Sequence, residues 1–344
     1  MRKVVVIGHF SFKKEKLNGQ TIKTKVVAQE LIRRFGEGEV TCVDTAGGWR
    51  FLSRLPVVFL SALRNHCHVI LMPAYKAVFI LSPLLVLMNV FSRRRLHFVT
   101  IGGRLPLIAR NHPFMKWVLG KFDYIYVETE LSHQEMLASG LENIVVMPNC
   151  KPLSIMSLDN QPMALNEPIP LCTFSRVIES KGIAEAAEAV TLCNRQLGRD
   201  AFRLDIYGQV EVPEWFDEMM SHQPSYIQYK GRIPFAESTK VLNHYFLLLF
   251  PTYYPGECFA GTIIDALAAG VPVIASDWRS NSELVDEGCT GFLFPVHNVN
   301  AMRDILLDAV SDPSKIQKMR AACLEKAWQF LPEVVLEDLA KRME

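Results

Sequence analysis

Two acidic residues and a glycine-rich turn stand together in the stretch 251–277. Two prolines and two glycines among residues 251–261 predict a loop, and the following residues 262–269 favour a helix. The N–H groups at a helix start, with the positive end of its dipole, suit a phosphate. The carboxylates of Glu257 and Asp265 suit sugar hydroxyls, because ionised carboxylates only accept hydrogen bonds. The stretch therefore predicts a site for a nucleotide sugar, and the alternative is a surface turn capped by acidic residues.

A second charged segment follows the strand predicted over residues 171–175. Arg176 and Lys181 are five positions apart, and an alanine-rich helix is predicted from residue 183 to residue 192. Arginine can hold a phosphate with two parallel hydrogen bonds, while lysine acts as a point charge. The spacing predicts that these two cations bind a diphosphate, and a solvated surface loop is the alternative.

Both segments resemble the donor site of family 4 glycosyltransferases of the GT-B fold. Residues 257–261 (ECFAG) and 265–270 (DALAAG) are similar to the family signature Glu-Gly-Phe-Gly-x-x-x-x-Glu-Ala-x-Ala-x-Gly. Residues 176–182 (RVIESKG) resemble the family's Gly-Arg-Leu-x-x-x-Lys-Gly.

The resemblance is uneven along the chain. It is specific over residues 171–295 and only topological over residues 1–150. Within the signature, Asp265 stands where the family has its second glutamate, and Cys258 and Ala260 replace glycines. The aspartate keeps the negative charge on a side chain one methylene shorter.

The resemblance implies roles for individual residues. Arg176, Lys181 and the N–H groups of residues 259–262 would stabilise the leaving diphosphate, Glu257 would bind hydroxyls of the transferred sugar, and Asp265 would bind the ribose. The full set expected to bind the donor is Asn18, Gly19, Arg176, Lys181, Gly208, Arg232, Ile233, Glu257, Phe259, Ala260, Gly261, Thr262 and Asp265. The set expected to act in catalysis is Arg104, His112, Arg176, Lys181 and Glu257.

Arg104 and His112 enter that set by their position. Residues 96–101 read as a strand, and we expect its end and the loop up to His112 to line a cleft on the acceptor side. An isolated arginine or histidine is more often structural, so this role competes with a structural one.

The element pattern predicts an α/β protein with two similar domains. A strand at 4–7 and a helix at 20–35 open the chain as in a doubly wound domain, and the same order recurs from residue 171. The resemblance implies the GT-B fold, with two Rossmann-like parallel-sheet domains facing across a cleft. We expect domains at 1–152 and 171–329 and a linker at 153–170. A last helix at 330–344 would pack back on the first domain.

The two halves differ in charge. Residues 1–150 hold 20 Lys and Arg against 10 Asp and Glu, while residues 151–344 hold 17 against 26. The first half is therefore expected to meet an anionic partner, either a membrane surface or a phosphate-bearing acceptor, unless it docks on the acidic half. We expect residues 77–91 to form a buried helix, with an interfacial membrane helix as the alternative because Arg93, Arg94 and Arg95 follow. The segment reads as too short and too interrupted to span a bilayer.

Cysteine usage and the N-terminus favour a cytoplasmic protein. The eight cysteines form no Cys-x-x-Cys pair or regular framework, and the start of the chain lacks the pattern of a signal peptide. We expect reduced thiols and peripheral contact with the inner face of the membrane. The resemblance implies that no metal and no further cofactor is needed, which agrees with the lack of an Asp-x-Asp motif in the sequence.

These observations predict a glycosyltransferase, and the resemblance implies that it retains the anomeric configuration. It would move a sugar from a nucleoside diphosphate sugar, most readily a UDP-sugar, to a hydroxyl of a glycan or lipid-linked acceptor in cell-surface polysaccharide synthesis. Nucleic acid is not an expected partner. The alternatives are a nucleotide-sugar epimerase of the same fold, a non-catalytic sugar-nucleotide binding protein and, weakly, a nicotinamide oxidoreductase, since neither half has the glycine fingerprint.

Overall fold

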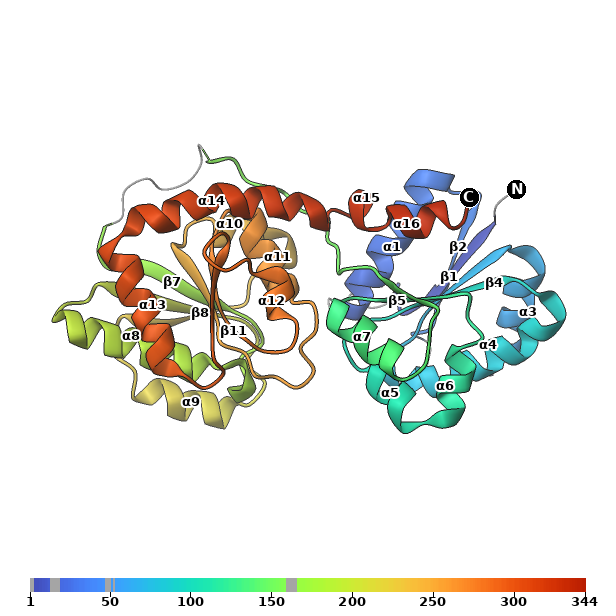
Figure 1. Ribbon diagram of the computed structural model, residues 1–344, viewed down its shortest axis with the longest axis horizontal. Coiled ribbons are helices and arrows are strands. Elements are labelled where there is room, and N and C mark those ends of the chain that lie inside the picture. The colour runs from blue at the N-terminus through green and yellow to red at the C-terminus, as the bar shows by residue number, and fades with distance from the viewer. Residues whose placement is uncertain (1–2, 13–18, 47–50, 52, 159–165) are drawn as a thin grey trace. The chain divides into compact units, whose positions relative to one another are not determined.

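The computed structural model describes residues 3–12, 19–46, 51, 53–158 and 166–344 (Figure 1). The chain divides into two compact units, each with its own core. One unit holds residues 1–152 together with 330–344, and the other holds residues 153–329. We refer to them as the N-terminal and C-terminal units.

The N-terminal unit is built on a parallel sheet in the order β2-β1-β3-β4-β5-β6. Its strands are β1 (Val4–Gly8), β2 (Val40–Asp44), β3 (His68–Met72), β4 (Arg95–Val99), β5 (Tyr124–Val127) and β6 (Ile144–Val146). Its helices before the C-terminal segment are α1 (Gly19–Phe35), α3 (Leu55–Asn65), η1 (Tyr75–Ala77), α4 (Val78–Ser92), α5 (Leu105–Asn111), α6 (Pro113–Leu119) and α7 (Glu130–Ala138).

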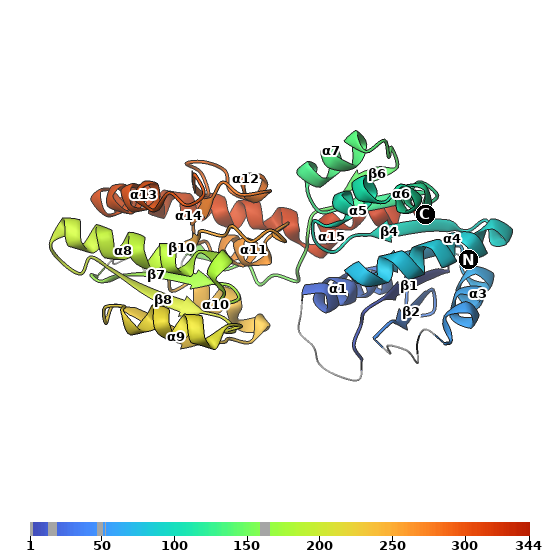
Figure 2. The same ribbon diagram turned by 90° about the horizontal axis from the view of Figure 1, so that it is seen from below.

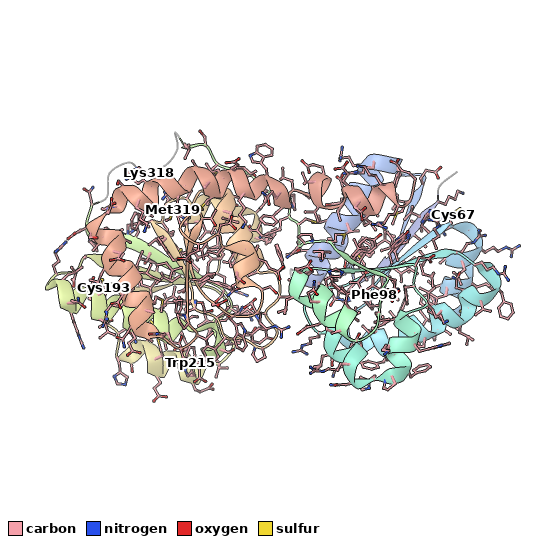
Figure 3. All side chains as sticks on the ribbon, viewed as in Figure 1. Cys67, Phe98, Cys193, Trp215, Lys318 and Met319 are labelled. Atoms are coloured by element: carbon pink, nitrogen blue, oxygen red, sulfur yellow. The ribbon has the colours of Figure 1, made fainter. Side chains whose placement is uncertain are left out.

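Helices cover both faces of this sheet, which explains why its strands are almost continuously apolar. Val5 and Ile7 of β1 join the core formed with α3 to α7, where Phe98 also lies (Figure 3). Val4 and Val6, which point the other way, join a second core with α1. Figure 1 shows α4, α5 and α6 on one side of the sheet and α1 on the other.

The C-terminal segment completes that second core. It contains η5 (Trp328–Phe330), α15 (Pro332–Val335) and α16 (Glu337–Lys341). Leu336 and Leu339 are fully buried there, and the N–H of Lys151 donates a hydrogen bond to the carbonyl of Phe330 at 3.2 Å. The end of the chain is therefore part of the N-terminal unit.

The C-terminal unit repeats the architecture with the order β12-β11-β10-β7-β8-β9. Its strands are β7 (Ile169–Phe174), β8 (Phe202–Tyr207), β9 (Ile227–Gly231), β10 (Leu247–Phe250), β11 (Val273–Ser276) and β12 (Gly291–Phe294). Its helices are η3 (Glu179–Lys181), α8 (Ile183–Leu197), α9 (Pro213–Ser221), η4 (Phe235–Glu237), α10 (Ser238–Leu242), α11 (Gly261–Ala268), α12 (Asn281–Leu284), α13 (Val299–Ser311) and α14 (Pro313–Ala327). Cys193 of α8 lies in the core shared with α9, α13 and α14 (Figure 3).

Three expectations from the sequence need correction. The first strand of the C-terminal unit begins at Ile169, so the expected linker ends too late. The expected loop up to His112 is the helix α5, in which Leu105 and Ile108 face the core. The helices α3 and α9 were not anticipated, although a proline stands in the first turn of each.

The apolar helix around residues 77–91 also differs from expectation. Together with η1 it runs from Tyr75 to Ser92, which is 18 residues with a mean hydropathy of 1.6. By length and composition alone it could cross a membrane, so it is not too short as the sequence suggested. Only 28% of this window is buried inside the protein, so the helix is half-buried and not fully internal.

Candidate functional site

The predicted donor residues follow three neighbouring strands of the C-terminal unit. Strand β7 lies between β10 and β8, and all three are parallel. Their carboxyl ends therefore meet at one edge of the sheet, which is where ligands of open parallel sheets bind. The loop 175–182 follows β7, and the loop 251–260 follows β10.

These two loops are in direct contact. Gly182 has a φ of +69°, and a Cβ at this position would lie 2.1 Å from the carbonyl oxygen of Pro251. The N–H of Tyr253 donates to the carbonyl of Ser180 at 2.9 Å. A glycine is therefore required at 182 for the two segments to approach this closely.

The contact brings Lys181 and Glu257 together. Their side chains form an ion pair, although they are 76 positions apart in sequence. The hydroxyl of Thr252 donates to the same carboxylate at 2.8 Å. Lys181 is 8% exposed, Glu257 9% and Thr252 0%. The ammonium and the carboxylate are thus held where little water competes for them.

Tyr254 lies beside both predicted cations. The Arg176 guanidinium lies 4.8 Å from the centre of the Tyr254 ring, and the Lys181 ammonium lies 5.3 Å from it. The indole N–H of Trp278 donates to the Tyr254 carbonyl at 2.9 Å. Arg176 is exposed and also donates to Glu211 at 3.2 Å. The ring therefore orients two positive charges at the same edge.

Two helices begin at this edge. Helix α8 begins at Ile183 after Gly182, and α11 begins at Gly261 after Ala260. Neither N-cap residue provides a capping side chain. The positive end of each helix dipole lies at this edge. Asp265, in the second turn of α11, is 5% exposed. Phe259 and Ala260 are buried as well, while Thr262 is half-buried.

The residues predicted near the base lie at the ends of β8 and β9. Gly208 has a φ of +141°, and a Cβ there would lie 1.6 Å from the carbonyl oxygen of Ser175, at the start of the β7 loop. The Tyr229 hydroxyl donates to the Gly208 carbonyl at 2.7 Å. Arg232 is exposed and reaches Gln209 at 3.4 Å, and Ile233 follows it. Gly208 thus joins the edge that carries Arg176.

The remaining predicted residues lie in the N-terminal unit. Gly19 is the first residue of α1, and Asn18 lies outside the described residues. Arg104 lies over the ring of Tyr75 at 5.2 Å, and His112 contacts the ring of Phe79 edge-on at 5.1 Å. The centres of the Tyr75 and Phe79 rings lie 6.4 Å apart, so Arg104 and His112 belong to one exposed aromatic cluster.

Sequence analysis missed several polar residues. Thr252 and Tyr254 lie inside the loop that it singled out, and the aromatic pair at 253–254 was a signal. In the N-terminal unit, buried Lys23 of α1 donates to Glu128 at 2.5 Å, and Glu128 also accepts from the N–H of Gly102 at 3.3 Å. This pair had no local signal, because its members are 105 positions apart.

The structure also bears on metals and thiols. Among the described residues, no group of three or more His, Cys, Asp or Glu side chains is placed to hold a metal ion. The eight cysteines are all free thiols. Burial raises the pKa of the Cys150 thiol to about 12, which keeps it protonated and unreactive.

Comparison with solved structures extends over the whole chain. The crystal structure of Alr3699/HepE from Anabaena in complex with UDP matches with a TM-score of 0.77, covering 99% of both chains at 14% identity. The fold is that of the GT-B glycosyltransferases. At this identity the GT-B likeness concerns the fold alone.

Sequence comparisons concentrate on the C-terminal unit. Residues 169–312 match the family model described as glycosyl transferases group 1. The chain is 23% identical over 186 residues to the amylovoran biosynthesis glycosyltransferase AmsK of Erwinia amylovora, which is 53% of this chain and 46% of that protein. It is 27% identical over 194 residues to the GtfA subunit of the UDP-N-acetylglucosamine–peptide N-acetylglucosaminyltransferase of Streptococcus gordonii, which is 55% of this chain and 37% of that protein. The GT-B chain thus aligns with less than half the length of each of these two relatives.

Proposed function

We propose that this GT-B protein is a glycosyltransferase that uses a nucleoside diphosphate sugar. The observation that carries the proposal is the meeting of Lys181 and Glu257, with Arg176 beside them, at the edge where α8 and α11 begin. Cations and helix starts suit a diphosphate, and a carboxylate suits hydroxyls. A nucleotide sugar carries a diphosphate and sugar hydroxyls next to each other.

The chemistry requires stabilisation of a leaving group. The bond between the anomeric carbon and the diphosphate oxygen breaks, a new bond forms to the acceptor oxygen, and the acceptor's proton is released. Negative charge grows on the diphosphate as the bond breaks. Arg176, Lys181 and the start of α11 are positioned to stabilise that charge, and such preorganised groups lower the barrier. Glu257 would bind the sugar hydroxyls, and Asp265 the ribose.

The finer features are part of the same proposal. Uridine is favoured because the matched GT-B structure of Alr3699/HepE contains UDP. The proposed role in cell-surface polysaccharide synthesis rests on the resemblance, and the similarity to AmsK, an amylovoran biosynthesis glycosyltransferase, supports a role in biosynthesis. The resemblance of the donor motifs supports four further features: membership of family 4, retention of configuration, independence of metal, and a glycan or lipid-linked acceptor. The proposed cytoplasmic location rests on cysteine usage and the N-terminal sequence. We also propose that the N-terminal unit contacts anionic membrane, because this unit carries a net positive charge.

A thermal-shift screen against nucleotides and nucleotide sugars tests the proposal. A ligand that binds only the folded protein raises the melting temperature by mass action, so no acceptor is needed. We expect UDP and one UDP-sugar to stabilise the wild type and to stabilise Lys181→Ala much less. The matched control is Lys240→Ala, which changes an exposed lysine of α10 and should respond as the wild type does.

Three outcomes separate the alternatives. If no nucleoside diphosphate raised the melting temperature, the assignment of the donor site would be wrong. Conversion of the stabilising sugar nucleotide without a second substrate would identify an epimerase. Binding without UDP release, even with a broad mixture of glycan and lipid-linked acceptors, would indicate a binding protein.

A further inference from the structure

Helix α4 is apolar on two opposite sides. Val78, Leu81 and Leu85 point into the core beside the sheet. Leu87 is 64% exposed and Phe91 is 90% exposed, on the side opposite those core residues. No charged residue occurs between Lys76 and Arg93. A surface helix of a globular protein ordinarily turns a polar face to water, and α4 does not.

Neighbouring helices extend this exposed surface. Helix α4 packs beside α3 and α6, and α5 packs beside α6, all in the layer that covers one face of the sheet (Figure 2). Each of these helices also carries large apolar side chains that point to solvent. We call the following set the apolar face: Val57, Leu60, Ile80, Leu87, Val90, Phe91, Leu107, Phe114 and Trp117.

The same part of the chain is strongly basic. Between Asp44 and Asp123 there is no Asp or Glu, while there are 11 Lys and Arg residues. Those that are exposed are Arg54, Arg64, Lys76, Arg93, Arg95, Arg104, Arg110, Lys116 and Lys121. Much of the positive charge of the N-terminal half is therefore concentrated in the segment that forms the apolar face.

We propose that the apolar face docks the N-terminal unit on the surface of an anionic lipid bilayer. Apolar side chains would enter the headgroup region, and the surrounding cations would attract the negative lipids. Trp117 and Phe114 stack at 6.1 Å, and the Lys121 ammonium lies 5.3 Å from the Trp117 ring. Tryptophan beside lysine is typical of membrane interfaces. The inference rests on the membrane contact named under the proposed function and assigns it to a defined surface; its test does not require transferase activity.

Two other occupants fit the observations less well. A symmetric dimer through this face would bring the same cations of two copies together, which costs free energy unless anions intervene. A spanning orientation of α4 would remove Val78, Leu81, Leu85 and Val86 from the core of the unit. A bilayer surface satisfies both the exposed apolar side chains and the charge while the fold stays intact.

Vesicle sedimentation with the full chain tests the proposal. We compare vesicles of phosphatidylcholine alone with vesicles of phosphatidylcholine and phosphatidylglycerol in equal parts. The wild type is expected to sediment with the anionic vesicles, to stay in solution with the neutral ones, and to be released by high salt because salt screens surface charge.

Paired variants identify the surface. The double variant Leu87→Glu with Phe91→Glu is expected to reduce partitioning about tenfold or more, since two exposed apolar groups that would enter the bilayer become charged. Arg64→Gln with Arg110→Gln is expected to reduce it about twenty-fivefold, at roughly a fivefold loss for each cation. The controls place the same changes on the C-terminal unit: Val212→Glu with Trp328→Glu, and Lys240→Gln with Lys318→Gln.

Tryptophan fluorescence gives a second readout, which reports whether Trp117 itself enters the bilayer. Brominated phosphatidylcholine in the anionic vesicles is expected to quench tryptophan emission of the wild type and of Trp328→Phe, and to quench Trp117→Phe much less. Three outcomes overturn the proposal: no sedimentation with anionic vesicles at low salt, equal loss in the controls, or quenching that does not depend on Trp117. Self-association abolished by Phe91→Glu, without vesicle binding, would assign the face to a second copy.

Discussion

Lys181 and Glu257 form an ion pair, so each charge has a partner within the chain itself. Sequence analysis assigned them separately, one to the diphosphate and one to the sugar. Their contact means that a donor would meet a preformed pair whose charges are largely removed from water. Charges held in place in this way need little reorganisation during the reaction.

The first prediction concerns the lysine. Lys181→Ala is expected to reduce sugar transfer about a hundredfold or more, because it removes a group that stabilises the leaving diphosphate. Initial rates of UDP release with donor and acceptor measure the effect. Lys240→Ala serves as the matched control, and turnover of Lys181→Ala near that of the wild type would contradict the assignment.

The second prediction concerns the carboxylate. Glu257→Gln keeps the size of the side chain and an oxygen for the Thr252 hydroxyl, but it removes the charge that faces Lys181. We expect transfer to fall about tenfold or more, while UDP binds at least as tightly because Lys181 keeps more of its positive field. Titration calorimetry with UDP measures the binding. A collapse of UDP binding would show that Glu257 has another role.

The third prediction concerns pH and the stability of the N-terminal unit. His97 is fully buried between β3 and β5, where its ring lies 3.1 Å from His68 and 3.3 Å from the Tyr126 hydroxyl. Burial, with the charges of His68 and Arg95, lowers the pKa of His97 to about 3. Between pH 3 and the unfolded value of 6.5, the unfolded chain binds the proton and the folded one does not. Stability is therefore lost as pH falls through this window.

The expected loss is measurable. From pH 7 to pH 5 the free energy of unfolding should fall by roughly 2 kcal/mol from this group alone. Denaturant unfolding of the wild type and of His97→Gln at both pH values tests it, because the variant should lose less between them. His133→Gln on α7 is the control, and an equal pH dependence in His97→Gln would contradict the prediction.

At the scale of elements, the site depends on how closely two loops approach. The β7 loop and the β10 loop come from strands that are neighbours in the sheet but far apart in sequence. Their contact is set by backbone, because the left-handed Gly182 lies against Pro251 and Tyr253 bonds to Ser180. The helix starts of α8 and α11 are positioned by the same contact.

The fourth prediction tests this approach with two glycines of similar φ. Gly182→Ala places a methyl group against the Pro251 carbonyl, whereas the same change at Gly198, with φ of +66°, meets nothing within 4 Å. Gly198→Ala should cost only the left-handed conformation, about 1–2 kcal/mol, with transfer unchanged. Gly182→Ala should separate the loops and abolish most transfer and UDP stabilisation. If Gly182→Ala and Gly198→Ala changed activity equally, the contact between the β7 and β10 loops would not be required for function.

Some elements followed from local pattern and others did not. The strand predicted at 4–7 and the helix predicted at 20–35 each match the structure to within one residue, because one is a short β-branched run ending at glycine and the other has apolar residues at helical spacing. Helix α5 was mistaken for a loop because it is short and begins with proline after two glycines. In that segment, burial of Leu105 and Ile108 outweighs the local turn signals.

At the scale of the whole molecule, the chain end belongs to the unit where the chain begins. Leu336, Leu339 and Met343 cover the face of the sheet formed by Val4 and Val6. The Arg342 guanidinium lies 4.5 Å from the ring of Tyr124 on β5. The N-terminal unit is thus incomplete without its last fifteen residues, 330–344.

The fifth prediction tests that dependence. Leu339→Ala is expected to lower the free energy of unfolding of the N-terminal unit by about 2–5 kcal/mol, since it leaves a cavity in a closed core. Stabilisation of the C-terminal unit by UDP should persist. Differential scanning calorimetry with and without UDP resolves the two effects. Val334→Ala, at a half-exposed position of α15, should change stability by only a few tenths of a kcal/mol.

The sequence alone determined the repeated strand–loop–helix order, the parallel-sheet architecture and the residues Arg176, Lys181, Glu257 and Asp265 as a candidate set. These features are local, since periodicity, glycine turns and charge spacing act over a few residues. Tertiary structure decided that Lys181 pairs with Glu257, that Tyr254 lies beside both cations, and that one side of α4 faces solvent. These facts depend on which strands become neighbours and which helix faces find a partner. Such pairings can join positions more than a hundred residues apart, and no local pattern records them.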